Sequence, residues 1–444
     1  MIAHASGDAV VAYRAGAPIR VWQFLEDVRR LVATLEGAAH VLNACTDRYH
    51  FSVGFAASLA SGAVSLLPPT TTPEMVCQLQ RFAPGAVCLT DQPDCDIALP
   101  QVRYPPAART NGIGSGDCAP AAIPLIADTQ LAGYVFTSGS TGAPVPHPKT
   151  FGPLARCVRI EAERLGLRAG EPWAIVATVP PQHMYGFESS VLMAMLNGHA
   201  LCAERPFYPA DVTAALEAIP RPRLLVSTPV HLRALLASGL ALPPTDLILS
   251  ATAPLAQHLA EEAEQRFGTH LLEIYGSTET GQIAARRPTV SAEWRLWPEV
   301  KLSIEGEESF AEGGHLERRT RLYDVLELTG EDRFLLHGRV TDLVNIAGKR
   351  SSLGYLNHQL NSIPGVLDGA FFHVEETAVL KTGVARVGAC VVAPGLDATR
   401  LLEALRQRVD PVFLPRPLLL VPRLPRNSTG KLSQEALRSL AAAR

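Results

Sequence analysis

The chain lacks the cysteine patterns that mark metal centres and disulfide frameworks. Its eight cysteines form no C-x-x-C pair and no Cys/His cluster with the spacing of a zinc site. The N-terminal segment, MIAHASGDAVV, has no basic stretch followed by an apolar run, so no secretion signal is visible. We therefore expect reduced, mostly buried thiols in a cytoplasmic protein.

An excess of charge of either sign is also absent. Charged residues make up 19% of the 444 residues, and the formal net charge is -3 with a sequence pI near 6.5. This balance gives no general attraction to nucleic acid or to anionic membranes. Hydrophobic residues make up 47%, which allows large buried cores and argues against wholesale disorder. The length allows two or three domains.

The sequence predicts no membrane span. The uncharged stretch Phe51–Pro69 is interrupted by four serines and by Gly54 and Gly62, and it ends in two prolines. A spanning helix needs about 20 strongly apolar residues. We expect a buried helix that runs into a buried strand.

Apolar, strand-like runs alternate with helical patterns through the first three-quarters of the chain. This alternation predicts an α/β fold, with a large N-terminal domain of layered, mostly parallel sheets and helices. Strands are predicted at 134–136, 174–179, 224–227, 247–250 and 271–275, and helices at 154–165, 189–196, 230–236 and 255–267. The Pro-, Asp- and Gly-rich segment 91–124 is expected to be a surface loop.

The pattern changes after about Phe310, where short strands and turns lead into a second, smaller αβ pattern. We therefore place an N-terminal domain at 1–337, a hinge at 338–342 and a small, mobile α+β C-terminal domain at 343–444.

The first motif with chemical potential is TSGSTGAP, residues 137–144, directly after a predicted strand. Its glycines let the backbone approach an anion, and its amides and hydroxyls can then surround phosphate oxygens. The pattern is not G-x-x-x-x-G-K-[ST], which excludes the usual NTPase loop. A flexible Ser/Gly turn is the alternative interpretation.

The second motif is YGSTETG, residues 275–281, at the end of another predicted strand. Tyr275 is suited to stacking on a base, Thr278 to bonding a phosphate and Glu279 to holding Mg²⁺ through its carboxylate. Taken alone, the motif is equally typical of a polar turn.

Two more motifs lie toward the C-terminus. GRVTDLVNIAGKR, residues 338–350, places an Arg and an Asp in a short loop between the two domains, which suits ribose bonding and a hinge. LPRNSTGKLSQEAL, residues 424–437, places Lys431 on a Gly-containing loop before an amphipathic helix. An ammonium carried by a moving domain can stabilise charge on an α-phosphate and a carboxylate. An ordinary charged linker and a solvated lysine are the alternatives.

In this order and spacing, the four motifs resemble those of the acyl-adenylate-forming superfamily. That superfamily includes acyl- and aryl-CoA synthetases, the adenylation domains of peptide synthetases, and luciferases. The resemblance covers most of the chain and implies ATP and Mg²⁺ as cofactors. The segments before the phosphate loop and between Glu279 and Asp324 look short for this family, so we expect a trimmed N-terminal domain with a reduced barrel-like subdomain.

The resemblance implies roles for individual residues. Lys431 would be the adenylation lysine, His183 in PQHMYG would gate the carboxylate, and Thr278 would contact phosphate, all three as catalytic residues. Glu279 would hold the metal. The implied nucleotide-binding residues are Thr137, Ser138, Gly139, Ser140, Thr141 and Gly142 in the phosphate loop, Thr252, Ala253 and Pro254 in the adenine wall, Tyr275 at the base, and Asp324 and Arg339 at the ribose.

The chain departs from the family pattern at several positions. Val145 stands where the family's phosphate loop has a lysine, and Lys149 follows four residues later; Lys149 either reaches back to the β- and γ-phosphates or the contact is lost. Ala251 and Thr252 replace glycines of the adenine wall, which would narrow that side of the pocket. Thr341 stands where the family's hinge often has Asp or Lys.

The expected function is ATP-dependent activation of a carboxylic acid as an acyl-adenylate, followed by transfer to a thiol. The chain also looks like the short ligases of aryl polyene and xanthomonadin-type pigment pathways. That narrower likeness implies a small aromatic acid and an acyl carrier protein, whose acidic surface would suit an arginine-rich C-terminal domain. One alternative acceptor is coenzyme A, and an alternative of another class is a non-catalytic nucleotide-binding scaffold.

Overall fold

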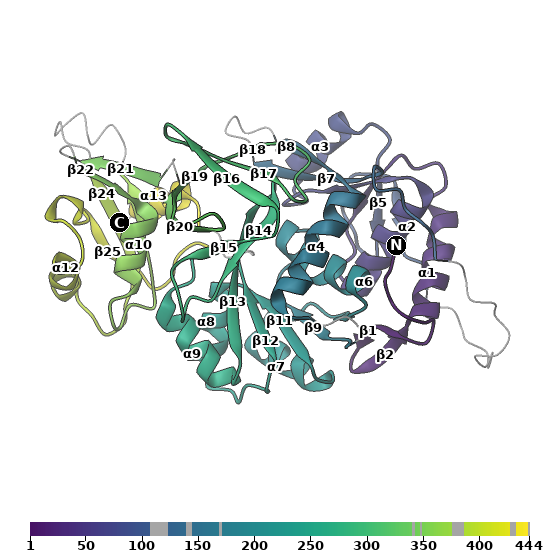
Figure 1. The fold of residues 1–444 in the computed structure, drawn as a ribbon, viewed down its shortest axis with the longest axis horizontal. Coiled ribbons are helices and arrows are strands. Elements are labelled where there is room, and N and C mark those ends of the chain that lie inside the picture. The colour runs from purple at the N-terminus through teal and green to yellow at the C-terminus, as the bar shows by residue number, and fades with distance from the viewer. Residues whose placement is uncertain are drawn as a thin grey trace.

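The computed structural model describes residues 1–106, 123–138, 144–167, 171–339, 342–346, 349–374, 386–426 and 432–442. Its large N-terminal part is built on two sheets with parallel central strands, with helices between and around them (Figure 1). A smaller C-terminal part lies at one end of the molecule. The predicted α/β class, with one large and one small domain, is confirmed.

The larger sheet has 11 strands. From β13 to β1 all neighbouring strands are parallel, and the pairs toward both edges are antiparallel. In spatial order its strands are β19 (Asp324–Leu328), β20 (Arg333–Arg339), β15 (Trp294–Leu296), β14 (Gly281–Arg286), β13 (His270–Ser277), β12 (Leu247–Ser250), β11 (Arg223–Ser227), β9 (Ala174–Ala177), β10 (Ala200–Cys202), β1 (Val10–Arg14) and β2 (Ala17–Arg20).

The smaller sheet has six strands, and only its last pair is antiparallel. In spatial order these are β6 (Gln101–Arg103), β5 (Val87–Thr90), β3 (His40–Asn43), β4 (Val64–Leu67), β7 (Leu131–Ser138) and β8 (Pro144–Thr150). The segment predicted as a loop at 91–124 therefore contains a strand, β6, which the Pro- and Asp-rich composition around it concealed.

The helices begin and end where local chemistry directs them. Asp47 caps α2 by accepting a hydrogen bond from the His50 amide at 2.9 Å, and Gly62 ends it in a left-handed conformation. The predicted buried helix running into a buried strand is confirmed as α2 and β4. The helices of the N-terminal part are α1 (Val21–Thr34), α2 (Arg48–Ser61), α3 (Pro73–Phe82), α4 (Phe151–Leu165), α5 (Met184–Gly186), η1 (Phe187–Leu192), α6 (Met193–Asn197), α7 (Pro209–Ala218), α8 (Pro229–Ala237) and α9 (Gln257–Phe267). Among the described residues, no helix has the length and apolar character needed to cross a bilayer.

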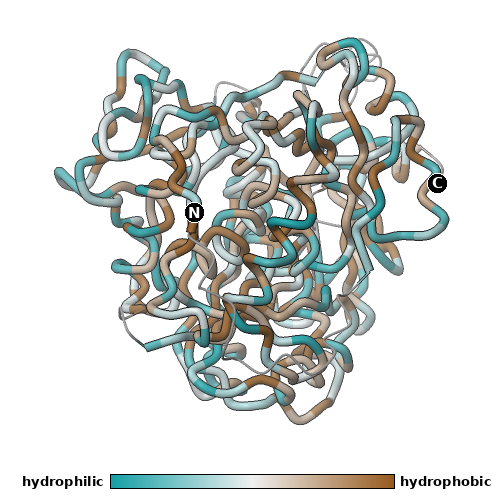
Figure 2. The backbone as a smooth tube through the Cα atoms, turned by 90° about the vertical axis from the view of Figure 1, so that its right-hand side faces the viewer, coloured by the Kyte–Doolittle hydropathy of each residue, from teal (hydrophilic) through white to brown (hydrophobic). Residues whose placement is uncertain are grey.

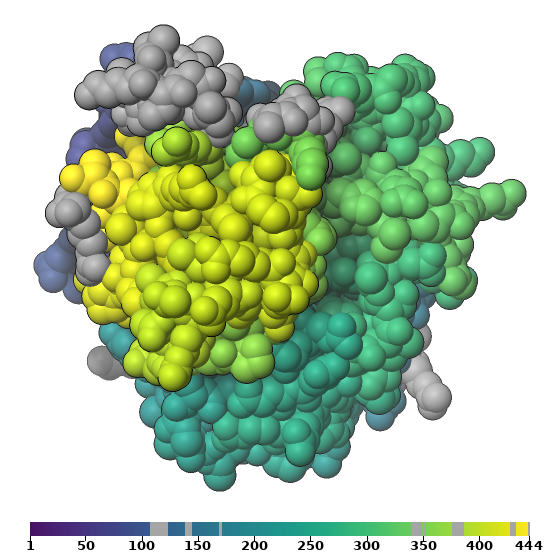
Figure 3. All heavy atoms as spheres, turned by 90° about the vertical axis from the view of Figure 1, so that its left-hand side faces the viewer, coloured from purple at the N-terminus to yellow at the C-terminus, as the bar shows by residue number. Residues whose placement is uncertain are grey.

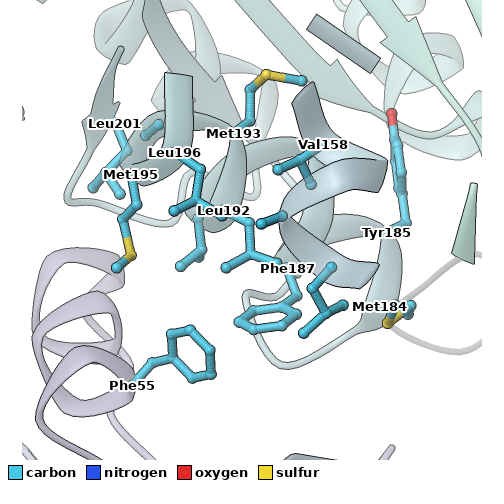
Figure 4. Close-up of a cluster of buried hydrophobic side chains, with 14 of the residues drawn as sticks. Phe55, Val158, Met184, Tyr185, Phe187, Leu192, Met193, Met195, Leu196 and Leu201 are labelled. Atoms are coloured by element: carbon cyan, nitrogen blue, oxygen red, sulfur yellow. The ribbon is translucent and has the colours of Figure 1, made fainter. Parts of the chain in front are cut away.

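Residues 184–196, which lie between the two sheets, are all buried. Phe187 packs edge-on against Phe55 of α2, with ring centroids 4.8 Å apart, within a cluster that also contains Val158 of α4 (Figure 4). The helix predicted at 189–196 proves to be a π-helix, η1, followed by the α-helix α6. Apolar spacing does not separate the two helix types, and short π segments often occur near functional sites.

A separate three-stranded antiparallel sheet precedes β19 and β20 in the chain, and these two strands lead into the C-terminal part. The interior of the molecule is the more hydrophobic part of the tube in Figure 2.

The remaining elements are β16 (Val300–Glu305), β17 (Glu308–Gly313), β18 (Thr320–Leu322), β21 (Leu343–Ile346), β22 (Lys349–Ser352), α10 (Leu353–Asn361), β23 (Asp368–His373), β24 (Val387–Val392), α12 (Ala398–Arg406), η3 (Pro411–Phe413), β25 (Leu418–Leu420) and α13 (Gln434–Ala442).

The C-terminal part packs against α8 and its neighbours, as Figure 3 shows from its outer side. It has hydrophobic cores of its own, which contain only residues from Val344 onward. Across the contact, Arg233 of α8 lies 3.6 Å from the Asp368 carboxylate, which Arg426 also holds at 2.8 Å. The predicted hinge at 338–342 overlaps the end of β20, and residues 340–341 lie outside the described residues.

Candidate active site

Three of the segments predicted to carry site residues directly follow parallel strands of the larger sheet. Residues 178–183 follow β9, residues 251–256 follow β12 and residues 278–280 follow β13. Since β9, β11, β12 and β13 run parallel, their carboxyl ends meet at one edge of the sheet. That edge is where open α/β sheets bind their ligands.

Side chains of β8 connect the smaller sheet to this edge. His147 Nε2 lies 2.9 Å from the Thr137 hydroxyl on β7 and 3.7 Å from the Glu279 carboxylate. Burial lowers the pKa of His147, while the Glu279 carboxylate acts in the opposite direction. His147 therefore links two predicted site residues: Thr137 on the smaller sheet and Glu279 in the turn between two strands of the larger sheet.

The turn Ser277–Gly281 carries Thr278 and Glu279. Its Thr280 hydroxyl lies 3.1 Å from the Ser277 amide and donates to the Gly281 carbonyl at 2.7 Å. A Cβ atom on Gly276 would lie 2.2 Å from the Gly281 carbonyl oxygen, so the two arms of the turn approach too closely for any other residue. The turn is a tightly packed structure with its Glu279 side chain 30% exposed.

The predicted ribose contacts lie opposite each other. Asp324 begins β19 and pairs with Arg339 at the end of β20, and their charged groups are 3.7 Å apart. The Tyr275 hydroxyl donates to Asp324 Oδ2 at 2.8 Å. Burial raises the pKa of Asp324, while the hydrogen bond from Tyr275 and the positive charge of Arg339 act to lower it.

The Tyr275 ring is held by other aromatic rings. Its centroid is 5.4 Å from that of Phe334 and 5.6 Å from that of Trp294, and the residue is only 8% exposed. This packing fixes the hydroxyl that orients Asp324, a contribution that the base-stacking interpretation did not include.

The predicted adenine wall, residues 251–254, follows β12. The next residue, Leu255, donates its amide to the Glu273 carboxylate at 3.0 Å, and Glu273 in turn pairs with Arg286 at 2.7 Å. Thr252 has a φ of 78°, in the left-handed region that β-branched residues rarely adopt. Glycine adopts this backbone conformation without a steric penalty, so it would be the least strained residue at position 252.

Thr252→Gly should leave the protein as stable as before, or more stable. The strain of a β-branched residue at positive φ is about 1–3 kcal/mol, and its relief offsets the entropy that glycine adds to the unfolded chain. Thr213→Gly, inside helix α7, is the matched control and should destabilise the protein, because glycine has the lower helix propensity and the hydrogen bond from the Thr213 hydroxyl to the Pro209 carbonyl is lost. Thermal unfolding of both variants provides the measurement, and an equal loss in the two would show that Thr252 is unstrained.

His183 immediately precedes α5, and its carbonyl accepts the Phe187 amide at 2.8 Å. A buried polar cluster joins α4, η1 and β14. The Ser189 hydroxyl donates to Glu161 Oε1 at 2.8 Å and lies 2.8 Å from the side-chain amide of Gln282. Burial raises the pKa of both buried carboxyls, Glu161 and Glu188, above the usual range.

Several predicted residues cannot be placed. Gly139, Ser140, Thr141, Gly142 and Lys431 lie outside the described residues, as does the side chain of Ser138. The described strands still mark both ends of the phosphate loop, because Ser138 of β7 pairs with Pro144 of β8. The amphipathic helix predicted after Lys431 is present as α13.

Sequence reasoning missed residues that act through other residues. His147 and His315 each contact the turn Ser277–Gly281, and Arg48 is fully buried beside the segment that leads to His183. A lone His or Arg has no sequence signal for such a role. The His-x-Lys spacing places His147 and Lys149 on one face only once β8 is known to be a strand.

Comparison with known proteins agrees with this geometry. Residues 23–308 match the family model described as AMP-binding enzyme. The 4-coumarate–CoA ligase of Rhodobacter capsulatus is 33% identical over 64% of this chain and 70% of its own length. The 3-hydroxybenzoate/4-hydroxybenzoate–CoA ligase of Thauera aromatica is 25% identical over 71% and 67%.

Among solved structures, the o-succinylbenzoate CoA synthetase of Bacillus subtilis in complex with its acyl-adenylate intermediate superimposes with a TM-score of 0.79. It is 18% identical, and the match covers 98% of this chain and 96% of that one, so the likeness concerns the fold. The chain therefore belongs to the AMP-binding enzyme family, and the predicted enzyme class, an AMP-forming acid–thiol ligase, is confirmed.

Proposed function

We propose that this protein uses ATP to activate a small aromatic carboxylic acid as its acyl-adenylate and then transfers the acyl group to coenzyme A. Relatives named for 4-coumarate, indoleacetate and hydroxybenzoate support an aromatic acid and this acceptor. The observation that carries the proposal is the convergence of Thr137, Glu279 and Asp324 from separate segments on one edge of the larger sheet.

The nucleotide would lie across this edge. Asp324, held by Tyr275 and facing Arg339, would accept hydrogen bonds from the ribose hydroxyls. The wall at 252–254 would flank the adenine. The phosphate loop between β7 and β8, together with Thr278, would contact the phosphates.

Glu279 provides a single carboxylate for a metal ion. Among the described residues, no three His, Cys, Asp or Glu side chains cluster closely enough to hold a metal by themselves. This donor set fits Mg²⁺, which proteins commonly bind through one or two carboxylates together with nucleotide phosphates. Mg²⁺ bound there would neutralise phosphate charge.

In the first step, a substrate carboxylate oxygen would attack the α-phosphorus of ATP while the bond to pyrophosphate breaks. Alignment and charge stabilisation would provide the catalysis, without a side-chain nucleophile. His183 would position the carboxylate, and Lys431 would stabilise the charge that develops at the α-phosphate. In the second step, the thiol sulfur would attack the acyl carbon and AMP would leave.

A carrier-protein acceptor is the second candidate. Arg416 and Arg423 are exposed on the C-terminal part and would suit an acidic partner. Arg426, in the same part of the chain, instead pairs with Asp368. The narrower likeness to aryl polyene ligases, which implies this acceptor, stays a prediction.

The acceptor and the acid can be tested in one experiment. The protein would be incubated with ATP, Mg²⁺ and either 4-coumarate, 4-hydroxybenzoate or a fatty acid, and with either coenzyme A or an acyl carrier protein. Mass spectrometry would then identify the thioester formed. We expect an aryl-CoA product; aryl thioester on the carrier protein alone would overturn the coenzyme A assignment.

Glu279→Gln should raise the Mg²⁺ concentration needed for half-maximal adenylation by about tenfold, because it removes the carboxylate charge that holds the ion. The measurement is a Mg²⁺ titration of ATP–pyrophosphate exchange at fixed ATP. Glu312→Gln, an exposed change on β17, is the control. An unchanged titration in Glu279→Gln would remove this residue from the metal site.

A further inference from the structure

β8 carries a lysine at a position unlike that of the family's phosphate-loop lysine. Val145 stands at the loop and is 45% exposed, whereas Lys149 lies four residues farther along the same strand. The strand register pairs Val145 with Thr137 and Lys149 with Gly133. At 3.3 Å per residue the two positions are about 13 Å apart, so Lys149 cannot take over a contact made at the loop.

Lys149 instead holds the turn that carries Glu279. Its ammonium donates to the Glu279 backbone carbonyl at 3.1 Å. Burial lowers the pKa of Lys149, and the nearby Glu188 carboxylate opposes this effect more than any other charge. Lys149 is half-buried, and its ammonium is held at the turn by the Glu279 carbonyl.

The next carbonyl of the same turn is held in the same way. His315 Nε2 lies 3.0 Å from the Thr280 carbonyl, so this nitrogen must carry the hydrogen. Burial lowers the pKa of His315 to about 4, so the ring is neutral at physiological pH. Two successive carbonyls of one short turn are thus fixed by side chains from two distant segments.

His147 completes the arrangement from the same face of β8. It contacts the Glu279 carboxylate at 3.7 Å, two residues before Lys149 contacts the Glu279 carbonyl. A strand presents alternate residues to one side, so both basic side chains can reach a single residue. Strand β8 therefore contacts both the backbone carbonyl and the side-chain carboxylate of Glu279.

Resting on the function proposed above, we propose that Lys149 is a positioning residue for the metal carboxylate: it fixes the backbone of Glu279 so that the carboxylate faces the nucleotide. The lysine that the family places at the phosphate loop is replaced, in this chain, by one that acts through Glu279. His315 supports the same turn through the Thr280 carbonyl.

The test compares Lys149→Met, Lys149→Arg, Glu279→Gln and the double variant Lys149→Met/Glu279→Gln. Lys301→Met, on the exposed side of β16, is the control. Two quantities are measured: the Mg²⁺ concentration for half-maximal ATP–pyrophosphate exchange, and the amide hydrogen exchange of residues 277–281 in the protein without ligands.

We expect Lys149→Met to raise the half-saturating Mg²⁺ concentration by about tenfold, the size of one charge-assisted hydrogen bond, and to change the rate at saturating Mg²⁺ much less. Lys149→Arg should restore most of the loss. In the Glu279→Gln background, adding Lys149→Met should change the Mg²⁺ requirement by less than about twofold, because coupled residues are not additive. Hydrogen exchange at 277–281 should be faster in Lys149→Met than in Lys301→Met.

An equal Mg²⁺ shift in both backgrounds, or unaltered hydrogen exchange at 277–281, would overturn the positioning role. If Lys149→Met folds poorly, Lys149→Met/Glu188→Gln takes its place with Glu188→Gln as control, since this pair removes both buried charges. If none of the acids supports ATP–pyrophosphate exchange by the wild-type protein, the proposed function fails. Hydrogen exchange at 277–281 still decides whether Lys149 fixes the turn.

Discussion

Lys431→Ala should slow carboxylate-dependent ATP–pyrophosphate exchange by about 100- to 1000-fold, the usual effect of removing one group that stabilises transition-state charge. ATP affinity should change little, because the ground-state nucleotide contacts come from the N-terminal part. The exchange rate and the ATP dissociation constant are measured separately, and Lys301→Ala serves as the surface control.

The same variant separates the two half-reactions. If the C-terminal part rotates between the steps, Lys431 is needed only for adenylation. Lys431→Ala supplied with synthetic acyl-adenylate and thiol should then form thioester at close to the wild-type rate. Wild-type exchange in this variant would contradict the role given to Lys431, and an equal loss in both half-reactions would contradict the rotation.

Arg48→Met should destabilise the N-terminal part by about 3 kcal/mol or more, because it leaves several buried acceptors without donors. The Arg48 guanidinium is fully buried and donates to the Ser190 hydroxyl at 2.8 Å and to the Ala177 and Val179 carbonyls at 2.9 and 2.8 Å. Burial lowers its pKa to about 10, so it still carries its charge at neutral pH.

The position of these acceptors gives Arg48 a connection to the site. Ala177 and Val179 lie at the end of β9 and just beyond it, and the chain then continues to His183, while Ser190 belongs to η1. Arg48→Lys should recover only part of the stability, since an ammonium lacks the planar fork that reaches separated acceptors.

Thermal unfolding and soluble yield measure the effect of Arg48→Met. Arg29→Met on α1 is the control, because the Arg29 side chain is 69% exposed and a surface pair contributes about 0–1 kcal/mol. Equal unfolding midpoints in the two variants would show that the guanidinium does not stabilise this region.

The α/β class and several central strands of the larger sheet could be predicted because buried parallel strands are short, apolar and continuous. The predicted segments at 224–227 and 247–250 correspond closely to β11 and β12. The predicted buried helix before Pro68 was also correct, since glycines and serines within an uncharged run favour a packed interior over lipid.

Other features depend on tertiary contacts that no local pattern contains. An arginine at the start of a helix is usually exposed, so nothing in the sequence indicated that Arg48 is buried. The roles of His147 and Lys149 depend on the register of β8 and on a turn about 130 residues away in the chain. The π-helix η1 has the same apolar pattern that an α-helix would have.

The motifs indicated the pair on β19 and β20 but not the buried polar cluster beside η1. Asp324 and Arg339 were paired through the family likeness alone, and the structure places them across two neighbouring strands. Glu161, Ser189 and Gln282 had no signal, because a buried polar cluster forms only when α4, η1 and β14 are assembled.

The most direct test is ATP–pyrophosphate exchange by the purified protein across aromatic, fatty and amino acids. We expect exchange that requires an acid and is fastest with hydroxybenzoates or 4-coumarate. An absence of acid-dependent exchange across the whole panel would contradict the claim that this protein forms acyl-adenylates.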